Sequence, residues 1–335
     1  MRLVIAALLF GMSLLLVPAQ AASFSCEAAE TPVEKSICSD ETLSAMDSTL
    51  ALAFAHAMAG LTEEAGIVAR QGQSDWLNYI DTVCADENLR RGTVPEFERP
   101  ICLRQLYLER LAILEQNRLV HGYRFYTVDR YAALANDNPE FKVARKVTSS
   151  LRIDGFDAFA LAFNAAAAEI TTAYSGKYKD FAGKAADDTK AQQDNAVLMR
   201  IVAHNDALLS VRLDTARYNH GAEYDTSFGM FHFWFDEARP LEASDLFEQQ
   251  GWQETLAVLI AERIAPDILY APAVDAADVA FAVDDPLQWS FTDAGMMVEF
   301  EPGQIEPAGS PAVVVPWSVL VDVMTFRGAD ISIWN

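Results

Sequence analysis

The sequence of 335 residues is poor in basic side chains, with 25 Lys and Arg against 48 Asp and Glu and a formal net charge of −23. Such a chain repels phosphate backbones unless its basic residues gather in a patch, and the longest basic run is Arg90 and Arg91. We therefore exclude nucleic acid as a partner. Gly and Pro are also scarce, at 16 and 13 residues, while 51% of residues are apolar. This composition excludes long-range disorder and provides enough apolar surface for a core.

The sequence has one long apolar run, Leu3 to Val17, which is shorter than the roughly 20 residues that cross a bilayer. Arg2 precedes this run, and Pro18 to Ala21 follow it with the small residues of an A-x-A cleavage site. This pattern is typical of a secretory signal peptide. We expect residues 1–21 to be removed, which changes the net charge from −23 to −24 through the loss of Arg2. We predict a periplasmic or secreted protein that has no membrane anchor after cleavage.

Only four cysteines are present, and all lie in the first third of the chain: Cys26, Cys38, Cys84 and Cys102. None belongs to a C-x2-C pair, so the spacing of zinc modules is missing. An even number of cysteines within one small exported domain favours two disulfides over a metal site.

Residues 22–118 have the pattern of a small antiparallel helical bundle. Thr31 to Glu34 combine an N-cap threonine, a proline at the first helical position and a capping-box glutamate. After a pause the chain restarts at Asp40 and runs as a helix to about Ala59. Two further helices are expected from about Thr62 to Val83 and from about Ile101 to Asn117.

The alternating helix directions place Cys38, Cys84 and Cys102 at one end of the bundle, where short-range bridges would close two loops. Cys26 leads into that same end. We favour Cys26–Cys38 with Cys84–Cys102, and the alternative is Cys38–Cys84 with Cys26–Cys102.

Several motifs of this domain occur in a specific order: Thr31 to Cys38, Leu43 to Asp47, Gln73 to Leu77, and Cys102 followed by Tyr107 and Arg110. Over about ninety residues they resemble the N-terminal domain family of the lysozyme inhibitor LprI. The resemblance implies an exported helical module, one of whose members inhibits lysozyme.

The pattern changes to mixed helix and strand after a connector at residues 119–140. We predict an α+β domain at 141–326, followed by a tail at 327–335. Strands are expected at 141–153, 196–204, 207–218, 226–235, 289–291, 296–300 and 312–316, and helices at 157–178, 244–264 and 317–324. The fold class is therefore multi-domain: a disulfide-stapled all-α helical bundle, then an α+β domain whose mainly antiparallel sheet has helices on one face.

The second domain also carries ordered motifs, among them Leu208 to Val211, Tyr218 with Gly221 and Ala222, Asp245 to Phe247, Phe291 to Met296, and Val313 to Pro316. These are similar to the C-terminal domain family of the anti-sigma factor RsiV. The resemblance implies an extracytoplasmic α+β domain, which in RsiV itself is the lysozyme sensor. The chain departs from the family at Asn219 to Glu223, where members often have Gly-Gly-Ala-His.

Signatures of catalysis are missing from the sequence. It contains no G-x-S-x-G, no Walker-type loop and no G-x-G-x-x-G, which removes the usual signals for acyl transfer and nucleotide chemistry. His220, Glu223 and His232 lack the three or four convergent ligands of a metal motif. We interpret them as a polar loop followed by a histidine on a strand, and we predict no enzymatic activity, no metal and no cofactor.

The two resemblances and the acidic charge lead to a binding hypothesis. We expect the protein to bind and inhibit, or to sense, lysozyme or another cationic exported protein, with long-range attraction guiding the encounter. Steric occlusion of the lysozyme cleft would come from a loop whose candidate partner-binding residues are Tyr218, His220, Glu223, Tyr224 and Asp225. The alternative is a peptidoglycan-binding or cell-wall-modifying envelope protein without affinity for lysozyme.

Overall fold

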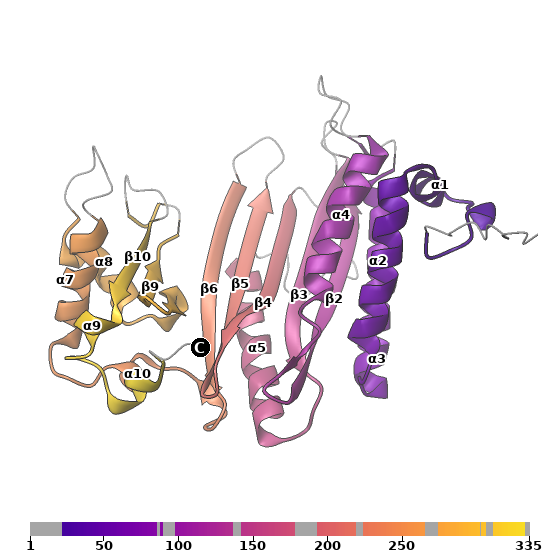
Figure 1. The fold of residues 1–335 in the computed structure, drawn as a ribbon. Helices are drawn as coiled ribbons and strands as arrows, with labels where there is room; N and C mark the ends of the chain where they lie inside the picture. Colours follow the sequence, from indigo (N-terminus) through magenta and orange to yellow (C-terminus); the bar gives the residue numbers. More distant parts are fainter. Residues whose placement is uncertain are drawn as a thin grey trace, which may run out of the picture.

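The computed structural model describes residues 22–85, 88–89, 98–136, 142–177, 193–218, 224–264, 274–301, 303–305 and 311–331. Figure 1 shows three parts in a row: a helical domain, a central sheet, and a C-terminal subdomain formed by residues 243–331. None of the helices in these ranges has the length and apolar character needed to span a membrane.

The helical domain begins with a short 3-10 turn, η1 (Cys26–Ala28), and continues through α1 (Pro32–Ser39), α2 (Glu41–Met58), α3 (Glu63–Val83) and α4 (Arg99–Leu114). The predicted helix starts are confirmed. Thr31 and Glu34 form a capping box, the Asp40 side chain accepts from the backbone of Leu43, and Thr62 caps α3. The last helix begins two residues earlier and ends three residues earlier than expected.

The helical domain contains two disulfides. Cys26 pairs with Cys38 and Cys84 pairs with Cys102, with Cα–Cα distances of 5.7 and 5.8 Å. The short-range pairing that we favoured is therefore confirmed. The core between the helices includes Trp76, whose ring meets that of Tyr107 edge-on at a centroid distance of 5.0 Å.

The central sheet has seven strands in sequential order: β1 (Leu119–Val120), β2 (Tyr123–Ala135), β3 (Val143–Ile153), β4 (Asp194–His204), β5 (Leu208–Tyr218), β6 (Tyr224–Trp234) and β7 (Arg239–Pro240). Neighbouring strands are antiparallel except β3 and β4, which run parallel. Helix α5 (Ala158–Lys177) lies between these two strands in the chain. A mainly antiparallel sheet is therefore confirmed.

The segment 119–140, which we expected to be a connector, contains β1 and β2. Strand β2 pairs with β3 from Phe125 opposite Ile153 to Ala135 opposite Val143. Charged residues in the middle of β2 interrupt its apolar alternation, and one of them, Asp129, is buried against a side chain from α4. The alternation pattern did not predict β2, because the side chain that makes a buried Asp129 acceptable belongs to another element, α4.

Helices cover both faces of the central sheet: α5 of the α+β domain covers one face, and the helical domain covers part of the other. On one face α5 packs through Phe163 against Phe231 and Phe233. On the other face the helical domain packs on the first strands, and Tyr131 and Val147 join its core cluster. Figure 1 shows α4 in front of the sheet and α5 behind it.

The C-terminal subdomain adds a second sheet, which the sequence did not predict as a separate layer. Its strands β8 (Trp289–Thr292), β9 (Gly295–Glu299) and β10 (Ala312–Pro316) are antiparallel in the order β10-β9-β8. The helical elements around it are α6 (Ala243–Leu246), α7 (Trp252–Ile264), α8 (Ala276–Val283), the 3-10 turn η4 (Pro286–Gln288), α9 (Trp317–Leu320) and α10 (Phe326–Ile331).

The single helix expected at 244–264 is two helices, α6 and α7. Phe247 leaves the helix to form an isolated bridge with Met324, and Gly251 adopts a positive φ of 84°. Glycine adopts this backbone conformation without steric cost, so the chain turns there before α7 begins.

Candidate functional site

A cavity of about 550 Å³ lies between α3 and α4 of the helical domain and the sheet face formed by β2 to β5. The helical domain covers only the first strands of this face. In Figure 1 β4 and β5 lie open between α4 on one side and the C-terminal subdomain on the other. The apolar lining residues include Trp76, Leu106, Ile113, Val147 and Leu198.

A buried ion pair holds the helical domain against the sheet beside this cavity. Arg110 of α4 and Asp129 of β2 have side chains that are 1% and 3% exposed, and Nη1 lies 2.5 Å from Oδ2. Asp129 also accepts hydrogen bonds from the hydroxyls of Thr127 and Ser149, at 3.0 and 2.7 Å. Both carboxylate oxygens are therefore satisfied, as a buried charge requires.

The guanidinium of Arg110 is shared between several acceptors. Its Nε donates to Oε1 of Gln73 at 3.1 Å, and Nη1 also donates to the Tyr131 hydroxyl at 3.2 Å. Burial opposes its charge, but Asp129 more than compensates and raises the pKa of Arg110 above its ordinary value. Arg110 thus stays charged and fixes α4 on β2.

Further ion pairs line the cavity on β3, β4 and β5. Arg145 contacts Asp194 at 2.9 Å, and Arg200 contacts Asp214 at 2.8 Å. Burial opposes the charge of Arg145, yet Asp194 raises the pKa of Arg145 above its ordinary range. The cavity therefore combines an apolar interior with arginine side chains that already have carboxylate partners.

The candidate partner-binding residues belong to the β5–β6 hairpin. Tyr218 lines the cavity, and its register partner across the hairpin is Tyr224. Asp225 forms an ion pair of 2.7 Å with Arg217. His220 and Glu223 lie outside the described residues, and of Tyr224 only the backbone is described. The structure therefore brings Tyr218 and Asp225 to one end of the hairpin, and Tyr218 to the cavity.

His232 is a buried residue whose two ring nitrogens both have protein partners. It is 2% exposed on β6, with Nδ1 2.8 Å from the Ser210 hydroxyl and Nε2 2.8 Å from the carbonyl oxygen of Trp289. Burial lowers the pKa of His232 to about 4, so the ring is neutral at physiological pH and joins the central sheet to the C-terminal subdomain. Within the described ranges, no group of three His, Cys, Asp or Glu side chains could hold a metal ion.

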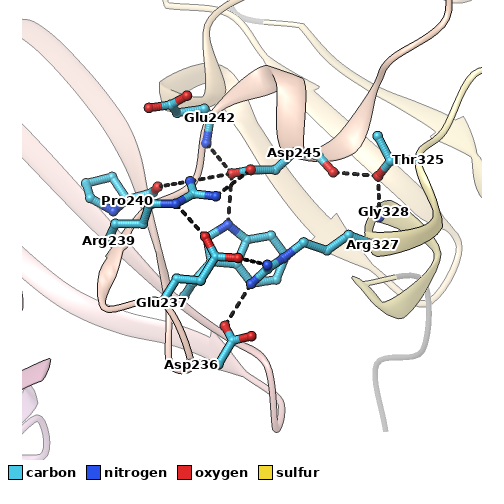
Figure 2. A network of polar contacts seen from close by, with 10 residues as sticks. Asp236, Glu237, Arg239, Pro240, Glu242, Asp245, Thr325, Arg327 and Gly328 are labelled. Carbon is cyan, nitrogen blue, oxygen red and sulfur yellow. Dashed lines mark hydrogen bonds and ion pairs between the residues drawn. The ribbon is translucent and has the colours of Figure 1, made fainter.

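A polar network at the base of β6 and β7 also joins the sheet to the C-terminal subdomain (Figure 2). Asp245 accepts from Arg239 at 2.6 Å and from the Trp234 indole at 2.9 Å. Arg327 of α10 lies over the Trp234 ring at 3.9 Å and contacts Asp236 at 2.7 Å. The network fixes α10 and α6 on the end of the central sheet.

Apart from Tyr218, sequence reasoning did not identify the residues that line the cavity or form the adjoining ion pair as parts of a site. Arg110 offered a signal, because it follows Leu106 by four residues and precedes Leu114 by four, and so lies on the apolar face of its helix. A charge on that face indicates a buried partner. Asp129 and Tyr79 offered no comparable signal, because their neighbours come from distant parts of the chain.

The solved structures that this chain resembles include two DUF3298-family proteins. One, from Bacteroides fragilis NCTC 9343, has 10% sequence identity and a TM-score of 0.46, covering 62% of this chain and 96% of the other. The second, from Pseudomonas aeruginosa PAO1, has 11% identity and a TM-score of 0.42, covering 61% and 95%.

Among curated proteins no match was found. Residues 25–114 match the model of the family described as "Lysozyme inhibitor LprI". These residues span the two disulfides and the helices from α1 to α4. The helical domain of this chain is thus similar to a lysozyme inhibitor family.

Proposed function

We propose that the protein is an exported lysozyme-binding protein that inhibits or senses lysozyme by steric occlusion of its cleft. The observation that carries this proposal is the match of residues 25–114 to the lysozyme inhibitor family. The signal-like segment at residues 1–21 and the two disulfides support export to an oxidising compartment such as the periplasm.

The charge distribution supports attraction of a cationic protein such as lysozyme. In the sequence of the C-terminal subdomain, residues 243–331, the basic side chains are Arg263 and Arg327. Arg327 is held by Asp236 and Glu237. The exposed carboxylates are Glu248, Glu254, Glu262, Asp275, Asp278, Asp284, Asp293 and Asp322. Such an excess of one sign steers an oppositely charged partner and raises its association rate.

The end of the β5–β6 hairpin is the element that we assign to the cleft. Tyr218 and Asp225 lie at this end on opposite faces of the hairpin, because Tyr218 is opposite Tyr224 and Asp225 is opposite Arg217. His220, Glu223 and Tyr224 belong to the same connection in the sequence. A tyrosine provides a rigid aromatic anchor, and carboxylates provide acceptors for basic groups of the partner. Binding by such an element would exclude the glycan substrate sterically.

Isothermal titration of the mature chain, residues 22–335, with lysozyme tests this proposal. Cytochrome c serves as a cationic control protein of similar size. We expect micromolar or tighter binding to lysozyme in physiological salt and at least tenfold weaker binding to cytochrome c. Equal affinity for the two would reduce the interaction to charge alone, and no heat with lysozyme would contradict the proposal.

Two single-charge variants locate the contact. Asp225→Ala should weaken lysozyme binding by about tenfold, because charged pairs at a desolvated contact carry much of the affinity. Asp206→Ala removes the same charge from the exposed turn between β4 and β5 at the other end of these strands, and should change affinity by less than about twofold. Equal effects would place the contact elsewhere. Retention on sacculi without lysozyme would support the peptidoglycan-binding alternative.

A further inference from the structure

The cavity under α4 has the size and position of a small-molecule site. Its volume of about 550 Å³ falls within the roughly 300 to 1,000 Å³ of ligand pockets, which occur preferentially between domains. Its walls come from the helical domain on one side and from β2 to β5 on the other. Two small side chains, Ala196 and Ala216, are register partners on its floor and leave the space open.

Tyr79 of α3 supplies an unused polar group in this cavity. Its side chain is 4% exposed and lines the cavity, and its ring lies 5.5 Å from that of Tyr131. Among the described residues its hydroxyl makes no hydrogen bond, whereas the Tyr131 hydroxyl accepts from Arg110. The Tyr79 oxygen is not one of the fully buried side-chain atoms that lack a partner, so this hydroxyl reaches the open space of the cavity. A ligand with an acceptor group would accept a hydrogen bond from it there.

The charges around the cavity select a neutral ligand. Each arginine that lines it already has a carboxylate partner: Arg110 with Asp129, Arg145 with Asp194, and Arg200 with Asp214. The carboxylate of Glu109, bonded to the neutral amide of Gln105, adds a negative charge on α4. An anionic ligand would meet this carboxylate without gaining a spare cation.

We propose that this cavity binds a neutral lipophilic molecule with a single hydrogen-bond acceptor, which lies against Leu198 and Val147 and accepts from the Tyr79 hydroxyl. Long-chain alcohols and acyl esters have this chemistry. The cavity shares Tyr218 with the proposed lysozyme contact, but the test of the cavity needs no lysozyme.

Nile red, a neutral dye with a carbonyl acceptor, serves as the fluorescent probe of the mature chain. We expect saturable binding and displacement by 1-decanol at a concentration at least tenfold lower than by decanoate. Stronger displacement by decanoate would overturn the assignment of a neutral ligand. Binding without saturation, or without displacement by either molecule, would overturn the site.

Two substitutions on the same strand locate the probe. Ala196→Phe fills the floor of the cavity and should weaken binding at least tenfold. Val202→Phe places the same side chain on an exposed part of β4 that does not line the cavity, and should leave binding within twofold. Circular dichroism verifies the fold of both variants, and equal binding by the two would overturn the proposal.

Tyr79→Phe tests the hydroxyl without changing the shape of the cavity. Because that hydroxyl has no protein partner, the variant should unfold at the same temperature as the parent chain or slightly above it. Its affinity for Nile red should fall about fivefold. A lower unfolding temperature, or unchanged affinity, would contradict the role given to the hydroxyl, and this result stands even if Ala196→Phe fails to fold.

Discussion

The two outer parts of the molecule are attached to the same central sheet in different ways. The helical domain is held by a buried polar cluster around Arg110 and Asp129, and a cavity remains beside it. The C-terminal subdomain shares one continuous apolar core with the sheet, in which Trp234 of β6 and Trp289 of β8 are both fully buried. The first contact thus leaves space for a ligand, whereas the second fills its space with protein.

The two contacts also differ in whether their charged groups are buried. At the helical domain, a charged pair is taken out of water and is fully hydrogen-bonded. At the C-terminal subdomain, His232 is buried in its neutral form and the ionic network of Arg239 and Arg327 is partly exposed. We therefore expect removal of one charge to destabilise the contact of the helical domain, and a fall in pH to destabilise the contact of the C-terminal subdomain.

The largest effect is expected from Asp129→Ala. This change leaves Arg110 buried without its partner, which typically costs about 3 to 5 kcal/mol. Urea denaturation of the mature chain would measure the loss in the free energy of unfolding. The double variant Arg110→Met with Asp129→Leu should recover most of that loss, because it removes both charges. A double variant as unstable as Asp129→Ala would show that the pair is not the source of the cost.

A somewhat smaller loss in the free energy of unfolding is expected when the pH is lowered, because of His232 at the contact of the C-terminal subdomain. The folded-state pKa of His232 is about 4, below its usual value of 6.5, so as the pH falls the unfolded chain takes up this proton first. The contribution of neutral His232 to the free energy of unfolding is complete above about pH 6.5. It decreases by about 3 kcal/mol as the pH falls toward 4. Chemical denaturation across this range would measure the loss.

His232→Gln provides the control for that pH dependence. The variant should be less stable than the parent chain at pH 7.5, because the bonds to Ser210 and Trp289 are altered. The difference between the two should shrink as the pH falls from 6.5 to 4. A constant difference across this range would show that His232 is not the titrating group.

A smaller loss of stability is expected from Arg327→Met in the network of Figure 2, and the smallest from its comparison variant, Arg200→Met. The Arg327 side chain is 29% exposed, so the lost contact with Trp234 and the lost ion pairs should destabilise the chain by about 1 to 2 kcal/mol. Arg200→Met, at a side chain that is 54% exposed, should cost less than about 1 kcal/mol. Thermal unfolding in matched buffers would compare them, and the reverse order would contradict the importance of the Trp234 stack.

Features decided by neighbours in the sequence were predictable. Thr31 and Glu34 predict the start of α1, and the preference for short-range bridges predicted the observed disulfides. The break between the strands expected at 196–204 and 207–218 was also predicted, and the Asn205 side chain caps the turn there by accepting from the backbone of Leu208.

Features decided by distant partners were not predictable. Asp129 looked like an interruption of a strand because Arg110, which satisfies it, lies 19 positions earlier on another element. The cavity depends on how far α4 reaches across the sheet, which no local pattern encodes. The short helix α8 did have a local signal in the capping box of Asp275 and Asp278, and the sequence reasoning passed over it.

The central claim is that the protein binds lysozyme and occludes its cleft. The most direct test is the rate at which lysozyme degrades a cell-wall suspension at physiological salt, measured with increasing amounts of the mature chain. We predict that turnover falls to a small fraction of its starting rate at micromolar protein, and that Asp225→Ala shifts the curve to higher concentration while Asp206→Ala does not. Undiminished turnover at micromolar concentrations of the mature chain would contradict the claim.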